Sequence, residues 1–188
     1  MKKIIKRMTN GLIAICLIAA LSATTVYATM VAYGSEKAGY MVCTKQLRKK
    51  TDTFDDSALN KTYRSYMNYG VKVWKDSGVV TLKRKSSSIN KVVMTKSDSR
   101  SLAWTYTWGD SRNGKIQQFE IWFNTRQMSK RGKSGNQAIA AHEIGHAIGL
   151  LDLYEKRNRD KLMYGIENKE VVKPTKADIK GGKYATRK

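Results

Sequence analysis

The chain of 188 residues has only two cysteines, two histidines and one proline. Two cysteines cannot build the dense disulfide framework of a cysteine-rich mini-protein. Two histidines exclude any site that requires three or more imidazoles. Acidic residues are also scarce, with 15 Asp and Glu against 36 Lys and Arg, which gives a formal net charge of +21.

The remaining composition suits one packed domain. A hydrophobic fraction of 41% is sufficient for a single core and argues against a disordered chain. The excess of positive charge favours anionic partners, such as cell-wall polymers or acidic substrate proteins. No helix-turn-helix, cysteine-based finger or aromatic RNA-binding motif is recognisable, so we expect no specific nucleic-acid partner. The alternative is that the basic residues only solvate a secreted domain.

Residues 1–28 have the pattern of a secretory signal peptide. Basic residues at positions 2, 3, 6 and 7 precede an uncharged apolar run over residues 11–23, and Val26-Tyr27-Ala28 fits a cleavage site. The apolar run is shorter than the roughly 20 residues of a membrane-spanning helix. We therefore expect cleavage after Ala28, no stable membrane insertion, and a monomer that a bacterium secretes or keeps at its cell wall. An uncleaved membrane anchor is the alternative.

Residues 29–56 show weak periodicity and a basic cluster at 45–50, so we interpret them as a linker or short pro-segment. Cys43, the one cysteine left after cleavage, has several possible roles. It can be a free thiol, an intermolecular link, a thiolate that blocks a metal site before activation, or a small residue in a poorly ordered segment.

The third expected segment, residues 57–188, has the periodicity of a folded domain. Apolar residues from Leu59 to Trp74 recur at helical spacing, and Asp56 or Ser57 can cap that helix. Apolar and β-branched runs predict strands at 79–83, 91–95, 102–108 and 116–124. A polar loop is expected over residues 126–135.

The most informative segment is His142-Glu143-Ile144-Gly145-His146, on a helix for which Ser134 is the expected N-cap. Histidines at i and i+4 project from one helix face, where two neutral imidazoles can bind one Zn²⁺. Glu143 lies next to them and can reach a water at the metal without binding the metal itself. Both histidines of the chain fall in this pattern, which argues against two unrelated structural histidines.

A third zinc ligand has to be a carboxylate, because no further histidine exists. Gly149 can end the helix in a left-handed turn, after which Asp152 folds back towards the metal. Three protein ligands with one open position are typical of catalytic zinc. The alternatives are that Asp152 is a solvated loop residue, or that Glu167 or Glu170 is the last ligand.

The stretch from His142 to Asp152 resembles the extended zinc motif of the metzincin proteases, in the Asp-terminated variant of snapalysin-like bacterial enzymes. Leu162-Met163-Tyr164-Gly165 resembles the Met-turn of that clan. Residues 174–184 are similar to the last helix of matrixin catalytic domains. The likeness spans about residues 57–184, but Tyr40-Met41-Val42-Cys43 does not match the matrixin cysteine switch.

This resemblance implies an α+β fold, with a twisted mixed sheet, an active-site helix and a C-terminal helix. It implies a zinc-dependent endopeptidase that acts on proteins or peptides, with a zinc-activated water and Glu143 as general base. Met163 would form the floor of the site, and Tyr164 would line the specificity pocket or stabilise the oxyanion. The strand at 116–124 would be the edge along which an extended peptide docks.

A function of another class stays open, namely a cationic module that binds polyanions or cell walls on a protease-like scaffold. Glu143 argues against it, because a purely binding role does not need a general base at that position.

Overall fold

The computed structural model describes residues 31–110, 113–165 and 171–187. The expected signal peptide and the alternative ligands Glu167 and Glu170 lie outside these ranges. In chain order the elements are β1 (Val31–Ser35), β2 (Tyr40–Cys43), β3 (Thr51–Phe54), α2 (Lys61–Asp76), β4 (Thr81–Arg84), β5 (Lys91–Thr95), β6 (Ala103–Asp110), β7 (Lys115–Asn124), α3 (Thr125–Met128), α4 (Lys133–Ile148), η2 (Lys156–Asn158) and α5 (Lys176–Ala185).

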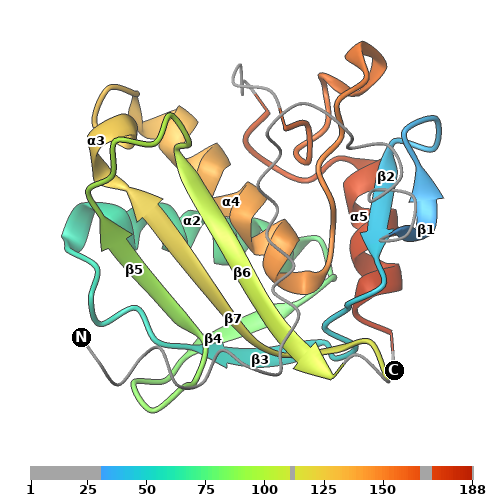
Figure 1. Cartoon of the computed structure of the whole chain (residues 1–188), viewed down its shortest axis with the longest axis horizontal. Coiled ribbons are helices and arrows are strands. Elements are labelled where there is room, and N and C mark those ends of the chain that lie inside the picture. The colour runs from blue at the N-terminus through green and yellow to red at the C-terminus, as the bar shows by residue number, and fades with distance from the viewer. Residues whose placement is uncertain (1–30, 111–112, 166–170, 188) are drawn as a thin grey trace.

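The sheets are small and mixed. Three strands follow the order β5-β7-β6, with β5 parallel and β6 antiparallel to the central β7. β3 and β4 form a parallel pair, and β1 and β2 form an antiparallel one. Helices α2 and α4 lie on one face of the three-stranded sheet, and α5 packs beside β2 (Figure 1). The fold is therefore α+β, as the sequence predicts.

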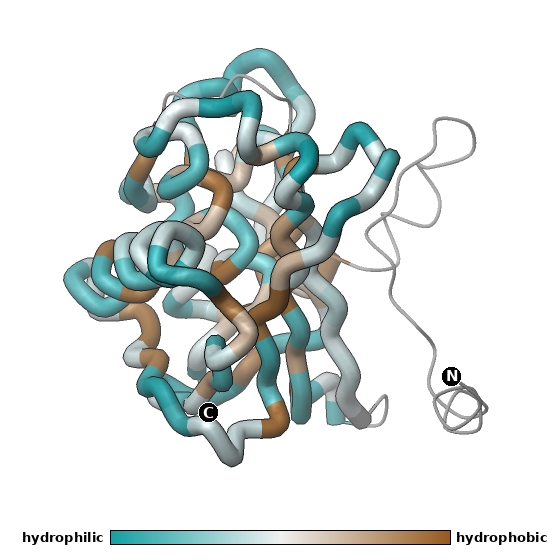
Figure 2. Tube along the Cα trace, turned by 90° about the vertical axis from the view of Figure 1, so that its left-hand side faces the viewer, coloured by the Kyte–Doolittle hydropathy of each residue, from teal (hydrophilic) through white to brown (hydrophobic). Residues whose placement is uncertain are grey.

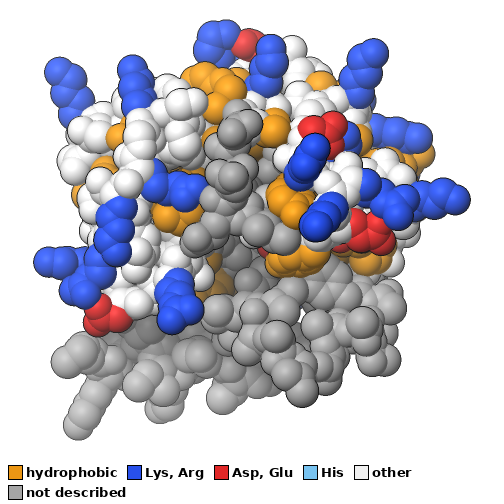
Figure 3. All heavy atoms as spheres, turned by 90° about the horizontal axis from the view of Figure 1, so that it is seen from above, with side chains coloured by type: hydrophobic (Ala, Val, Ile, Leu, Met, Phe, Trp, Pro, Cys, Tyr) orange, Lys and Arg blue, Asp and Glu red, His pale blue; other side chains and the backbone are white. Residues whose placement is uncertain are grey.

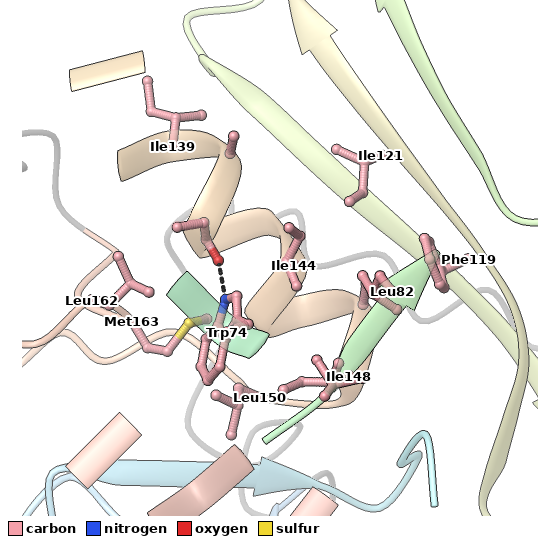
Figure 4. Packing of buried hydrophobic residues seen from close by; sticks show 14 of the residues in the cluster. Trp74, Leu82, Phe119, Ile121, Ile139, Ile144, Ile148, Leu150, Leu162 and Met163 are labelled. Carbon is pink, nitrogen blue, oxygen red and sulfur yellow. Dashed lines mark hydrogen bonds between the residues drawn. The ribbon is translucent and has the colours of Figure 1, made fainter. Parts of the chain in front are cut away.

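The core lies between α4, α2 and the sheet. Trp74 of α2 is fully buried, and its indole Nε1 donates to the carbonyl oxygen of Ala141 in α4 at 2.7 Å (Figure 4). Ile144 and Ile148 of α4 and Ile121 of β7 belong to the same buried cluster. Hydrophilic stretches dominate the outer loops in Figure 2, whereas apolar stretches run through the interior. Burial of these side chains is the main favourable term for the fold.

Residues 31–56 were expected to form a linker or short pro-segment, but they contain buried strands that belong to the core. All four residues of β2 are buried, as are Leu47 and Phe54. The backbone N–H of Cys43 donates to Gly149 at 2.8 Å, and that of Leu47 donates to Ile148 at 3.1 Å. This segment therefore packs against the end of α4 as part of the folded body. Its few apolar residues lie in short strands and a loop. The sequence therefore shows little periodicity, and this is why a linker was expected.

Two helix starts were predicted incorrectly. Asn60 caps α2 by accepting the Tyr63 N–H at 3.0 Å, because the Asp56 carboxylate is buried and bound by Arg84 at 2.8–2.9 Å. Helix α4 begins at Lys133, so Ser134 lies inside its first turn. The expected polar loop at 126–135 contains α3 and this first turn. The buried side chain of Asn136 donates to the Met128 carbonyl at 3.0 Å and joins the two helices.

The expected edge strand was also placed incorrectly. The strand predicted at 116–124 is β7, which pairs with β5 on one side and with β6 on the other. Its N–H and C=O groups are therefore used on both sides. Among the strands in the described ranges, β6 is the edge of this sheet on the α5 side (Figure 1). No helix in these ranges is long and apolar enough to span a membrane.

The contact between α2 and α4 depends on Gly70. A Cβ atom there would lie 2.9 Å from Ile144 Cδ1 and 3.0 Å from the α4 backbone at Ala140. We expect Gly70→Ala to lower the free energy of unfolding by about 1–3 kcal/mol, because α2 must move away from α4. Gly135→Ala is the control, since a Cβ at this helical residue would meet only Arg131 Nε, at an ordinary contact distance of 3.8 Å, and this variant should gain about 0.5–1 kcal/mol. Urea denaturation of both variants measures this, and equal stabilisation by both would contradict the close packing.

Candidate metal centre

Helix α4 carries His142 and His146 one turn apart, and its end turns the chain back towards them. Gly149 has a φ of 107°, as expected for a left-handed cap, and its N–H donates to the His146 carbonyl at 2.9 Å. A Cβ at Gly149 would lie 2.6 Å from the Lys45 carbonyl oxygen, so any other residue would clash. The reversal brings Asp152 to the two imidazoles.

Three side-chain atoms converge at this point. The His142 and His146 Nε2 atoms are 3.0 Å apart, and Asp152 Oδ1 lies 3.0 Å from the first and 3.5 Å from the second. Ligand atoms about 2.0–2.1 Å from a tetrahedral zinc are separated by roughly 3.3 Å. The observed spacing therefore fits a zinc ion held by these three residues. They also form the group of possible metal ligands found within the described part of the chain.

The backbone fixes which nitrogen of each imidazole faces the centre. His142 Nδ1 lies 2.8 Å from the Leu162 carbonyl oxygen, and His146 Nδ1 lies 2.9 Å from that of Leu150. A carbonyl oxygen can only accept, so each Nδ1 carries the hydrogen. In the neutral rings both Nε2 atoms are then lone-pair donors, as metal ligation requires. Two such atoms and a carboxylate oxygen repel one another unless a cation lies among them.

The pKa values of His146 and Asp152 also indicate that this cluster favours a bound positive charge. Burial disfavours the protonated form of His146, but the charge and hydrogen bond of Asp152, together with the charge of Glu143, raise the pKa of His146 to about 9. Burial would raise the pKa of Asp152, yet its contacts with the two histidines hold that pKa well below its usual range. The pocket therefore attracts a proton or a metal ion.

Glu143 is buried beside this cluster and is held by a residue that the sequence analysis did not single out. Its Oε2 accepts a hydrogen bond from Thr105 Oγ1 of β6 at 2.7 Å. Thr105 alternates with Trp104 and Tyr106 along the strand, so its side chain points to the opposite face of the sheet, towards α4. That alternation was the available signal, but it does not reveal which helix β6 faces.

The turn containing Met163 lies directly under α4. A Cβ on Gly145 would lie only 2.3 Å from Met163 Sδ, so the sulfur packs against the α4 backbone at the residue before His146. Met163 lies beside Trp74 there (Figure 4). The neighbouring Leu162 supplies the carbonyl that accepts from His142. The side chain of Tyr164 is buried. The backbone of Tyr164 forms a β-bridge with Leu153, the residue that follows Asp152.

A buried carboxylate from α5 holds this turn. Asp178 accepts the N–H groups of Leu162 at 3.0 Å and of Met163 at 3.1 Å, and it also accepts from the Thr175 N–H and hydroxyl. Cys43 does not take part in the cluster. Its thiol is buried on β2 and accepts the Lys45 N–H at 3.4 Å.

Comparisons with known proteins give a likeness of fold only. No protein-family model matches the chain, and no curated protein matches it significantly. Among solved structures, a chain from the "GM1 bound form of the ECX AB5 holotoxin" is similar, with a TM-score of 0.58 and 14% sequence identity. The match covers 82% of this chain and 91% of that one, so the two chains have similar lengths and a related fold.

Removal of the Asp178 carboxylate should loosen the floor of the site. In Asp178→Ala the two buried N–H groups lose their acceptor, so we expect the free energy of unfolding to fall by about 2–4 kcal/mol. Asp160→Ala is the control, because Asp160 pairs with Lys161 at the surface and should change stability by less than about 0.5 kcal/mol. Equal stabilities of the two variants in chemical denaturation would refute the role given to Asp178.

Proposed function

We propose that this protein is a zinc-dependent endopeptidase of the metzincin type, similar to matrixins, which a bacterium exports. One observation carries the proposal: His142, His146 and Asp152 converge at the spacing of zinc ligands, with Glu143 on the same helix. The order of these residues, the Gly149 turn and the Met163 turn match the clan's motif, and the α+β fold is compatible with it.

Nitrogen and carboxylate ligands in this number favour zinc over calcium or magnesium, which prefer more oxygen ligands. When bound, zinc would polarise the scissile carbonyl and lower the pKa of a water beside it. The carbonyl groups of Leu162 and Leu150 keep both imidazoles in the required tautomer and orientation.

Glu143 acts as the general base and then the general acid in this proposal. Its carboxylate accepts a proton from the attacking water, whose oxygen bonds to the peptide carbonyl carbon, and then gives that proton to the amine as the C–N bond breaks. No covalent bond to the protein forms. The hydroxyl of Thr105 donates to Oε2 and so holds the carboxylate in one orientation.

An extended substrate peptide is best accommodated on β6. This strand lies over α4, and one side of it is unpaired among the described strands. Its free N–H and C=O groups can pair with a peptide strand, which would lie close to Thr105 and Glu143. Tyr164, which follows Met163, would line the specificity pocket in this proposal.

Metal binding provides the first test. Purified apoprotein should bind one equivalent of Zn²⁺, and the thermal unfolding midpoint should rise because zinc binds only the folded state. Asp152→Ala should weaken zinc at least tenfold, since one ligand is lost. The control Asp160→Ala should bind as the unaltered chain does. Competition with a chromophoric chelator measures this, and no zinc uptake, or equal affinity in Asp152→Ala, would contradict the site.

Catalysis provides the second test. Glu143→Gln should reduce hydrolysis of a quenched peptide library by about 10²–10⁴-fold, because the general base is lost while the ligands remain. Its zinc affinity should fall far less than that of Asp152→Ala, because all three ligands remain. Glu155→Gln is the control, because this carboxylate is at the surface and pairs with Arg157. Retained turnover in zinc-loaded Glu143→Gln would exclude the mechanism.

The net charge of +21 supports one alternative, a cationic binding module on the same scaffold. It predicts retention of polyanions without peptide hydrolysis by the zinc-loaded chain. The hydrolysis assay above separates the two functions.

A further inference from the structure

The face of α5 turned away from Asp178 carries a row of basic residues over an open groove. Lys176, Lys180 and Lys183 are exposed and lie four and three residues apart, so they share one side of the helix, and Arg187 follows just after its end. Together with Ile179 and Tyr184 they line a groove of about 360 Å³. The four cations are exposed, whereas Ile179 and Tyr184 are partly buried.

These four cations have no carboxylate partner within the described ranges. Two of them are held by aromatic rings: Arg187 Cζ lies 4.1 Å from the ring centre of Tyr184, and Lys180 Nζ lies 5.5 Å from that of Tyr40. Tyr184 stacks in turn with Tyr33 and Tyr40, with ring centres 5.4 and 6.0 Å away. A cation–π contact orients a charge without neutralising it.

The arrangement is unfavourable for the isolated helix. Like charges at i and i+4 repel, and Lys176 in the first turn opposes the helix dipole. The acidic residue of that turn, Asp178, is fully buried on the other side and bonded to backbone N–H groups. An anionic ligand along the groove would offset this repulsion. Basic side chains are also spread widely over the face seen in Figure 3, so alignment over a groove, rather than charge alone, distinguishes α5.

We propose that the groove along α5 binds a linear phosphodiester polymer, with its phosphates on Lys176, Lys180, Lys183 and Arg187 and its carbon backbone over Ile179 and Tyr184. A single row of cations suits a chain that carries charge at every repeat. An extended acidic peptide fits less well, because successive side chains point to opposite sides. A membrane surface would require projecting apolar side chains, whereas Ile179 and Tyr184 are partly buried.

The test compares two triple variants of equal charge in the full chain. Lys176→Gln/Lys180→Gln/Lys183→Gln removes the row, and glutamine supports a helix as well as lysine does. Lys61→Gln/Lys75→Gln/Lys83→Gln removes three exposed lysines from α2 and β4 that form no ion pair within the described part of the chain. The probe is a poly(glycerol phosphate) chain of defined length, and affinity is measured by calorimetry at several salt concentrations.

We expect the α5 variant to lose at least tenfold in affinity and the control variant less than threefold. The slope of log affinity against log salt should become less steep by about 2 in the α5 variant, since three phosphate contacts are lost. Equal losses in both variants would show diffuse attraction by net charge and overturn the proposal. Stronger binding to phosphatidylglycerol vesicles or polyglutamate than to the polymer would also overturn it. Glu143→Gln should bind the polymer unchanged, because this surface does not depend on peptide hydrolysis.

Discussion

The structure is organised around three electron-rich atoms that face one another at about 3 Å: two imidazole nitrogens and a carboxylate oxygen. Such a cluster repels itself unless a cation lies within it, so the surrounding fold has to hold it in place. The carbonyls of Leu150 and Leu162 orient the rings, and the left-handed turn at Gly149 returns Asp152 to them. Asp178 fixes the Leu162 turn from below.

Helix α5 connects the centre with the surface. Its inner side presents Asp178 to the turn under the histidines, and its outer side presents the basic row. The same helix therefore supports the proposed zinc centre and carries three of the four cations of the proposed polymer groove, Arg187 lying just beyond its end. For the secreted protease that we propose, attachment of the α5 groove to an anionic wall polymer would keep the enzyme near the cell, and β6 is a separate element from α5 (Figure 1).

Local patterns in the sequence predicted much of this arrangement. The spacing of His142, Glu143 and His146 places them on one helix, and Gly149 marks the turn that makes Asp152 a neighbour. Partners from distant segments were not predictable in the same way. Thr105 faces Glu143 because β6 crosses α4, and Asn136 near the start of α4 bonds to the carbonyl of Met128 in the preceding helix. β7 was expected at an edge from the family resemblance alone, and its own sequence does not encode which strands lie on either side of it.

The pairing of β2 with the end of α4 has a consequence for how the chain reaches its native state. Cys43 and Leu47 find their backbone partners at Gly149 and Ile148, about a hundred residues later in the chain. β2 can pair with the neighbouring β1 early, but its contacts with the end of α4 cannot form until most of the polypeptide has been synthesised. Contacts of such wide sequence separation slow folding and favour a late, collective transition over stepwise assembly during translation. For the export that we propose, late folding of this kind would keep the polypeptide threadable through a narrow channel until its last segments have followed.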